Sequence, residues 1–132
     1  MKTFPLQIGT PDGLLFKGDV VRVVVRTITG DRAILAEHMD FCTGIGMGES
    51  HIVLEDGTVR RAACIGGMLT MVDGSCRLLA TTWEWSEDID KERAENAKKR
   101  AEEILQKTGL SDREYKVAKA KLNRALVRMS IN

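Results

Sequence analysis

The sequence has little of what marks several common classes of protein. Its 132 residues carry a formal net charge of +1 and include only 5% aromatic residues, two Pro and three Cys. A general nucleic-acid or membrane-surface binder would need an excess of basic charge, so this balance argues against both. No apolar run approaches the roughly 20 residues that cross a bilayer, and the N-terminus lacks the long apolar core of a signal peptide.

Motifs of catalysis and of metal binding are also missing. Cys42, Cys64 and Cys76 are odd in number and have no Cys-x-x-Cys spacing, which favours reduced thiols over a disulfide framework or a zinc site. His38 and His51 have no neighbouring Cys or carboxylate pattern for a metal. The sequence contains no Walker A motif and no nucleophile–base constellation, so we predict no hydrolytic pocket, no catalytic residues and no intrinsic metal.

The first part of the chain consists of short β-rich runs separated by Gly and by Asp-Gly turns, a pattern typical of an antiparallel sandwich or barrel. The pattern predicts a break at Gly18-Asp19 and an irregular segment over residues 38–48. In that segment Gly44-x-Gly46-x-Gly48 indicates a loop and not a phosphate-binding turn, because a strand follows it. Gly66-Gly67 allows either a tight reversal or a close backbone approach. The expected strands cover residues 3–8, 14–16, 20–28, 33–35, 51–54, 58–64, 68–72 and 76–82.

Beyond these runs the apolar residues recur at helical spacing. Ser86 or Asp88 is expected to cap a first helix, which ends near Gly109 in the left-handed C′ position. Ser111-Asp112-Arg113-Glu114 is a capping box that opens a second helix. Because the connecting turn is so short, the two helices must lie antiparallel.

The fold class that we predict is therefore α+β and mainly β. An N-terminal antiparallel β-sandwich occupies residues 1–86, and a C-terminal antiparallel two-helix hairpin occupies residues 87–132. The seam between the helices is built largely from Ala, which buries much less area than Leu at about 25 cal/mol per Å². The hairpin should thus be weakly held and cheap to open, which is a physical reason to suspect a switch.

Four motifs, taken in order, resemble a known family. They are the segments Thr10–Val20 and Gly30–His38, the pair Gly66-Gly67, and the motif Ile89-Asp90-x-x-Arg93-Ala94. Together they closely resemble the epsilon subunits of bacterial F-type ATP synthases, over nearly the whole chain. The resemblance implies a β-sandwich that binds the gamma subunit and the c-ring in the central stalk. It also implies a hairpin that moves between a folded state and an extended, inhibitory state that reaches the catalytic alpha and beta subunits.

The same resemblance implies a non-catalytic rotor subunit that couples proton translocation to ATP synthesis and inhibits ATP hydrolysis. Such a subunit lies at the cytoplasmic face of the bacterial cell membrane and is associated with the membrane only through the complex. No nucleic-acid partner is implied. Some family members also bind ATP as a regulatory ligand that is not hydrolysed. The residues that match or align with that site are Glu84, Ile89, Asp90, Arg93, Ala94, Arg100, Arg124 and Arg128.

Helix geometry supports this site independently of the resemblance. Asp90, Arg93 and Arg100 follow one stripe of the first helix, while Arg124 and Arg128 are one turn apart on the second. In an antiparallel hairpin the end that carries Arg128 returns beside Asp90, where converging guanidinium groups would suit a triphosphate. The alternative is that these charges form an ordinary solvated helix face.

Some positions depart from the family pattern. Ala36 stands where the family usually has Pro, and Trp83 and Trp85 flank Glu84 in place of small residues. We expect the two indoles to lie on opposite faces of an extended segment, one of them under the hairpin. There they could alter the nucleotide pocket and report ATP by their fluorescence.

Three classes of function are consistent with these observations. The first is the rotor subunit, which we favour. The second is a free-standing nucleotide-sensing protein of the same build, which would not co-purify with gamma. The third is a small β-fold enzyme, which would show intrinsic ATP turnover.

Overall fold

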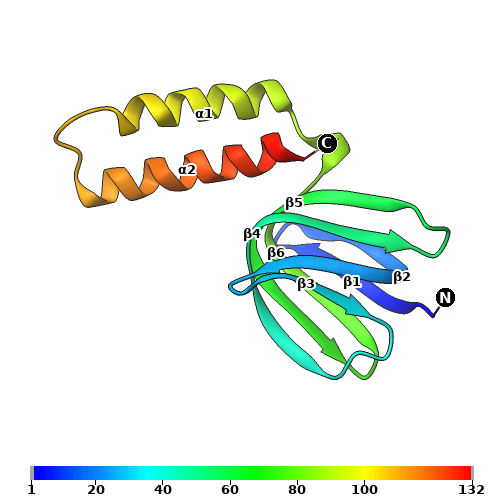
Figure 1. The fold of residues 1–132 in the computed structure, drawn as a ribbon. Coiled ribbons are helices and arrows are strands. Elements are labelled where there is room, and N and C mark those ends of the chain that lie inside the picture. The colour runs from blue at the N-terminus through cyan, green and yellow to red at the C-terminus, as the bar shows by residue number, and fades with distance from the viewer. Residues whose placement is uncertain (1, 132) are drawn as a thin grey trace.

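The computed structural model describes residues 2–131 as a β domain followed by a helical hairpin (Figure 1). A 3-10 helix, η1, joins the two parts. The elements are β1 Phe4–Thr10, β2 Gly13–Thr27, β3 Gly30–Leu35, β4 Phe41–Leu54, β5 Val59–Val72, β6 Ser75–Trp85, η1 Ser86–Asp88, α1 Lys91–Leu105 and α2 Asp112–Ser130. The predicted fold class, mainly β with a C-terminal two-helix hairpin, is confirmed.

The strands join into a barrel-like sandwich. They are hydrogen-bonded in the order β1-β6-β5-β4-β2-β3, and β1 also pairs with β2, so that five strands close into a ring. The ring closes through a parallel pair, β1 with β6, in which Leu6 lies beside Cys76. The remaining strand pairs of residues 2–131 are antiparallel, as predicted. The parallel pair departs from the expected pattern because it joins the first and last strands, which no local signal connects.

Alternate residues of each strand point into one core. In β1 the side chains of Phe4, Leu6 and Ile8 are buried, as the two-residue period of a strand requires. Trp83 and Trp85 of β6 belong to the same core, each 7% exposed, with their ring centroids 5.3 Å apart. The expectation that they lie on opposite faces is wrong, because residues two apart on a strand share a face.

The predicted break at Gly18-Asp19 is also wrong. β2 runs through both residues because β1 pairs with them, Leu6 opposite Gly18 and Pro5 opposite Asp19. The free energy gained from the hydrogen bonds between β1 and β2 therefore exceeds the cost of placing Gly and Asp within a strand.

The predicted irregular segment over residues 38–48 lies mostly within a long strand, β4, which pairs with β5 along most of its length. Its glycines lie within the strand and not in a loop, and Gly48 serves packing. At Gly48 an added Cβ would lie 3.0 Å from the Cβ of Arg26, so the absence of a side chain leaves room for that residue. The sequence-based interpretation failed because the reason for Gly48 lies on another strand.

The helices begin and end at positions that differ slightly from the prediction. Ser86 and Asp88 belong to η1, and the cap of α1 is Asp90, whose carboxylate accepts a hydrogen bond from the backbone N–H of Arg93 at 3.0 Å. Gly109 has the expected left-handed φ of +78°, but α1 ends earlier, at Leu105, so this glycine shapes the connecting loop.

The second helix begins as predicted. Glu114 N–H donates to the hydroxyl of Ser111 at 3.1 Å, and the Glu114 carboxylate accepts from Ser111 N–H at 3.3 Å. These two bonds form the predicted capping box, which satisfies two otherwise unpaired donors at the start of α2.

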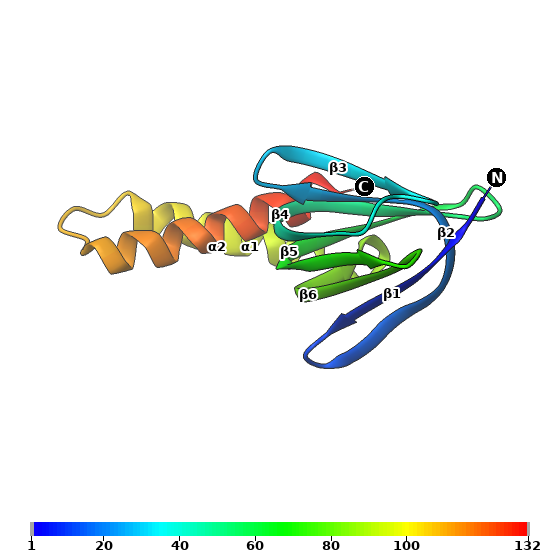
Figure 2. The ribbon, with the colours of Figure 1, turned by 90° about the horizontal axis from the view of Figure 1, so that it is seen from below.

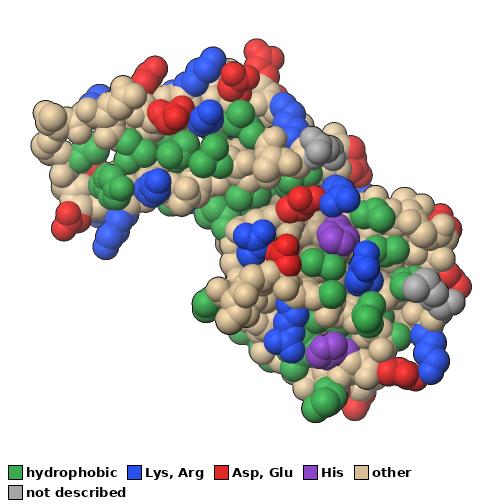
Figure 3. Space-filling model, viewed as in Figure 1, with side chains coloured by type: hydrophobic (Ala, Val, Ile, Leu, Met, Phe, Trp, Pro, Cys, Tyr) green, Lys and Arg blue, Asp and Glu red, His purple; other side chains and the backbone are tan. Residues whose placement is uncertain are grey.

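The two helices meet along a seam of small residues. Ala94 and Ala101 of α1 and Ala118 and Ala125 of α2 are buried, with Leu122 the one larger buried side chain of the two helices as described. Figure 3 shows hydrophobic side chains along the line between the helices, with charged groups on the outer sides. The thin Ala seam is therefore present as predicted.

The hairpin extends from one end of the β domain (Figure 2). The end of α2 contacts β4 and β5, and Ile131, which follows that helix, is fully buried. On the other side of the junction the Arg60 guanidinium lies over the Trp85 ring, 3.8 Å from its centroid, and binds the Glu87 carboxylate at 2.9 Å. These contacts position the hairpin on the β domain.

Candidate functional site

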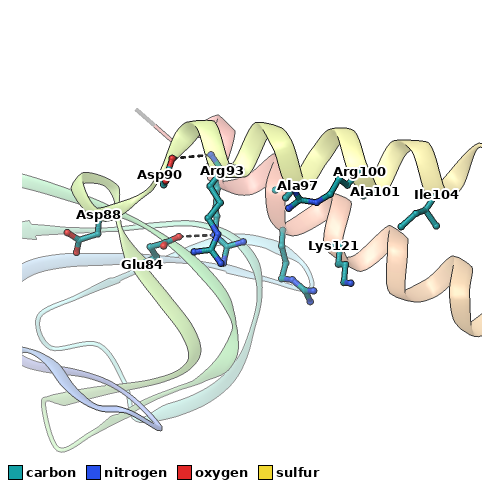
Figure 4. Close-up of a pocket in the computed structure, with 13 residues that line it drawn as sticks. Glu84, Asp88, Asp90, Arg93, Ala97, Arg100, Ala101, Ile104 and Lys121 are labelled. Carbon is teal, nitrogen blue, oxygen red and sulfur yellow. Dashed lines mark hydrogen bonds and ion pairs between the residues drawn. The ribbon is translucent and has the colours of Figure 1, made fainter.

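A groove of about 600 Å³ lies between the two helices where they approach the β domain (Figure 4). Its lining residues come from the end of β6, from η1 and from facing sides of both helices. They are Glu84, Asp88, Asp90, Arg93, Ala94, Ala97, Arg100, Ala101, Ile104, Lys121, Arg124, Ala125 and Arg128. Seven of the eight predicted site residues are in this set, and only Ile89 is outside it.

The convergence follows from helix periodicity. On α1 the lining residues recur every three or four positions from Arg93 to Ile104, which places them on one side of the helix. On α2 the same spacing runs from Lys121 to Arg128. Because the helices are antiparallel, the last turn of α2 lies beside the first turn of α1. The small Ala residues between the charges leave the space that forms the groove.

The groove carries more positive than negative charge. Five of its lining side chains are cationic and three are acidic. The acidic ones, Glu84, Asp88 and Asp90, come from the end nearest the β domain. Glu84 binds Arg128 with an Oε1–Nε distance of 2.8 Å, and the two side chains are 32% and 28% exposed. This half-buried ion pair connects the end of α2 to β6.

Sequence reasoning missed one cationic residue of the groove, Lys121. It lies three positions before Arg124 and seven before Arg128, so the same helical spacing that identified the arginines also selects it. Lys121 is not among the residues that the family resemblance implies for the site. The smaller lining residues Ala101, Ile104 and Ala125 were likewise not singled out.

The predicted fluorescence signal has no structural basis. Glu84 points into the groove, whereas its neighbours Trp83 and Trp85 point into the barrel core. A ligand in the groove would contact neither indole. The expectation that the tryptophans alter the pocket is therefore wrong, and ligand binding is better followed by stability or calorimetry.

Lys91, at the start of α1, forms a clamp on the end of α2. Its ammonium group donates to the backbone carbonyls of Arg128 at 2.9 Å and Met129 at 3.3 Å, and also to that of Ile131. The last carbonyls of a helix lack intrahelical partners and carry the negative end of its dipole, so a cation there is stabilising. The clamp joins the first turn of α1 to the last turn of α2 at the β-domain end of the groove.

Removing this clamp should loosen the last turn of α2. We expect Lys91→Met, which keeps most of the apolar stem, to lose about 1 kcal/mol of local stability, or about fivefold faster amide hydrogen exchange over residues 127–131. Lys107→Met, in the exposed loop after α1, is the matched control and should leave exchange unchanged. Equal exchange rates in both variants would show that the clamp contributes nothing in solution.

Two of the three cysteines, Cys64 and Cys76, are buried and poorly placed for chemistry. Burial raises the pKa of the Cys64 thiol to about 12 and that of Cys76 also to about 12, so neither is a thiolate near neutral pH. Residues 2–131 contain no group of three His, Cys, Asp or Glu side chains placed to hold a metal ion. No helix among those residues has the length and apolar character that crossing a membrane requires.

Comparison with known proteins gives concordant results. The family described as "ATP synthase, Delta/Epsilon chain, beta-sandwich domain" matches residues 3–86, and "ATP synthase, Delta/Epsilon chain, long alpha-helix domain" matches residues 87–131. The ATP synthase epsilon chain of Caldicellulosiruptor bescii is 38% identical over 131 residues, which cover 99% of this chain and 94% of that protein.

Two solved structures share the fold. A chain in the Euglena gracilis mitochondrial ATP synthase, in its OSCP/F1/c-ring assembly in rotational state 1, has a TM-score of 0.86 at 19% identity and covers 97% of this chain and 80% of its own. A chain in the Tetrahymena thermophila mitochondrial ATP synthase central stalk/c-ring structure has a TM-score of 0.62 at 13% identity, covering 98% and 96%.

A barrel-like β domain that carries a two-helix hairpin is thus the shared plan of this chain and its relatives. The family matches span both parts, and the identity to the bacterial relative extends over nearly the full length. The chain belongs to the delta/epsilon chain family of ATP synthase, and it is a non-catalytic subunit.

Proposed function

We propose that this chain acts in the central stalk of an ATP synthase and that ATP, bound in the groove, regulates it. In this proposal the β domain binds the gamma subunit and the c-ring, and the hairpin restrains ATP hydrolysis when it extends toward the alpha and beta subunits. The rotor then couples proton translocation to ATP synthesis at the cytoplasmic face of the membrane. The observation that carries the regulatory part is the convergence of five cationic side chains on one groove.

The groove suits a nucleotide in size and in charge. Its volume of about 600 Å³ lies within the roughly 300–1,000 Å³ typical of small-molecule sites. Guanidinium groups such as those of Arg93 and Arg124 match phosphate oxygens in geometry and charge. The carboxylates of Glu84 and Asp90 can accept hydrogen bonds from sugar hydroxyls. The sequence lacks a Walker A motif, so the bound ATP would not be hydrolysed.

The β domain offers a surface for protein partners. Gly9 of β1 pairs with Leu14 of β2 and with Leu79 of β6, and Leu79 in turn pairs with Met68 of β5. Directly paired residues share a face of the sheet. Leu14, Leu79 and Met68 are 61%, 64% and 49% exposed, so an apolar row crosses four strands on the outside of the domain. Such a row supports docking against another subunit.

The proposed switch depends on a difference in affinity. Extension of the hairpin would separate Arg93 of α1 from Arg128 of α2. ATP could then contact few of the groove residues at once, and its affinity would be low. A ligand shifts an equilibrium only through its preference for one state, so ATP favours the compact form. The Ala seam keeps the cost of opening low enough for a ligand to decide the outcome.

Loss of an arginine from the groove should weaken ATP binding. We expect millimolar ATP to stabilise the wild-type subunit by about 2.7 kcal/mol at a hundredfold excess over its dissociation constant. Arg93→Ala and Arg128→Ala should each lose about 1.5–3 kcal/mol of binding, as for hydrogen bonds to charged groups. The measurement is a thermal melt of the isolated subunit with and without ATP at fixed Mg²⁺.

The control for that experiment is Arg77→Ala, an exposed arginine of β6 outside the groove. It should respond to ATP as the wild type does. If ATP leaves the wild-type melt unchanged, the regulatory site does not exist in this chain. If ATP stabilises the wild type and both groove variants equally, it binds elsewhere.

A further inference from the structure

The charges of the groove are arranged in a gradient along its length. The three carboxylates lie at the β-domain end, and Arg100 and Lys121 lie toward the other end (Figure 4). Of the five cationic lining side chains, only Arg128 forms an ion pair with any residue in 2–131. Arg100, Lys121 and Arg124 therefore form a cationic end whose charge the described chain does not neutralise.

Such a cluster is unfavourable unless an anion is present. Arg100 comes from α1, whereas Lys121 and Arg124 come from α2, so closing the hairpin brings like charges together across the Ala seam. Lys121 and Arg124 are three residues apart on one helix, a spacing at which like charges are destabilising, and a bound polyanion would reverse the sign of that contribution. The compact hairpin thus gains more from a ligand with more negative charge at this end.

Helix geometry determines which cation lies farthest from the carboxylates. Lys121 is seven residues from Arg128, which at about 1.5 Å per residue places it roughly 10 Å farther along the groove. Arg100 of α1 lies at a similar distance from the β domain along the groove. Side chains lean toward the N-terminus of their own helix. Because the helices are antiparallel, Arg100 leans back toward the β domain and Lys121 leans away from it.

We propose that Lys121 completes a polyphosphate subsite beside Arg100 and Arg124, which the resemblance already implies for ATP, and that Lys121 contacts the terminal phosphate and sets the preference for a triphosphate over a diphosphate. The proposal rests on the proposed function of the groove, since it assumes that the sugar of the nucleotide lies at the carboxylate end. A nucleoside diphosphate placed in the same way ends before it reaches Lys121. The subsite acts on phosphate chemistry alone, so inorganic tripolyphosphate should also bind there.

The test is a calorimetric titration of the full chain with ATP, ADP and tripolyphosphate at fixed Mg²⁺. We expect Lys121→Gln to weaken ATP and tripolyphosphate by about tenfold or more, the usual effect of losing a hydrogen bond between charged groups, and ADP by less than about threefold. Lys121→Arg keeps the charge and should retain the preference for ATP. Lys119→Gln, on the exposed side of α2, should behave as the wild type does.

The outcomes separate this proposal from the proposed function. If ATP binds and Lys121→Gln changes nothing, or weakens ATP and ADP equally, the role of Lys121 is overturned while the regulatory site stands. If ATP does not bind but tripolyphosphate does, and Lys121→Gln abolishes it, the nucleotide function fails and the phosphate subsite stands. If the wild type binds neither ligand, both proposals are overturned.

Discussion

Gly67→Ala should destabilise the β domain more than any other small substitution that we consider. An added Cβ would lie 2.3 Å from the carbonyl oxygen of Leu79 and 2.8 Å from the Cα of Ala80, both backbone atoms of the neighbouring strand β6. The φ angle of Gly67 is +137°, which side chains rarely adopt. Gly67 thus serves a close backbone approach, the second of the two roles that the sequence allowed, whereas Gly66 supplies a positive φ of +74°.

The expected cost combines backbone strain of about 1–3 kcal/mol with overpacking of about the same size. Since small domains have only about 5–15 kcal/mol of stability, a fall in melting temperature of more than roughly 10 °C follows. Gly44→Ala is the matched control, because its added Cβ would meet nothing within 4 Å. The measurement is a thermal melt of both variants, which compares their melting temperatures with that of the wild type. Similar melting temperatures would contradict the close approach of β5 and β6.

Deleting the hairpin should leave the β domain folded while abolishing every response to ATP. The core cluster consists entirely of residues from the β domain, and α2 meets the strands at β4 and β5 and through the Arg128–Glu84 ion pair with β6. A fragment of residues 1–86 should therefore give dispersed amide-proton NMR signals. It should also retain gamma binding, because the exposed apolar row lies on the strands, and it should lose inhibition of ATP hydrolysis.

The complementary fragment, residues 87–132, should be largely unfolded in water. Short helices are marginal alone, and the Ala seam contributes little burial. Circular dichroism of this peptide beside the full chain measures the effect. An unfolded 1–86 fragment would refute the two-domain organisation, and a truncated subunit that no longer binds gamma would place the docking surface on the hairpin.

Local signals predicted the hairpin and its groove well. The capping box at Ser111 and Glu114 depends on neighbours three residues apart, and the convergence of Arg93 and Arg128 depends only on helix period and antiparallel return. Both features follow from short-range rules that can be read from the sequence alone. Ile89 was included through the family motif alone, and it is the one predicted site residue that lies outside the groove.

The errors at the glycines and at the cap of α1 have a different cause, which is that the deciding contact lies far away in the chain. Gly18 looks like a break until β1 is seen to pair with it, and Gly48 looks like a loop residue until Arg26 is seen beside it. The cap of α1 lies at Asp90 because Ser86 and Asp88 belong to η1, whose Glu87 binds the distant Arg60 of β5. Tertiary context overrides local preference in each of these cases.

The Ala seam has a further consequence, for the heat capacity of the proposed switch. Heat capacity rises when apolar surface is exposed, by about 0.45 cal/K/mol for each Å². Separating helices whose buried side chains are Ala94, Ala101, Ala118 and Ala125, with Leu122 the one larger residue, exposes little such surface. The free energy of opening should therefore vary almost linearly with temperature, without the curvature of a folding transition. The nucleotide concentration that sets the state of the hairpin would then change steadily with growth temperature, without passing through an extremum.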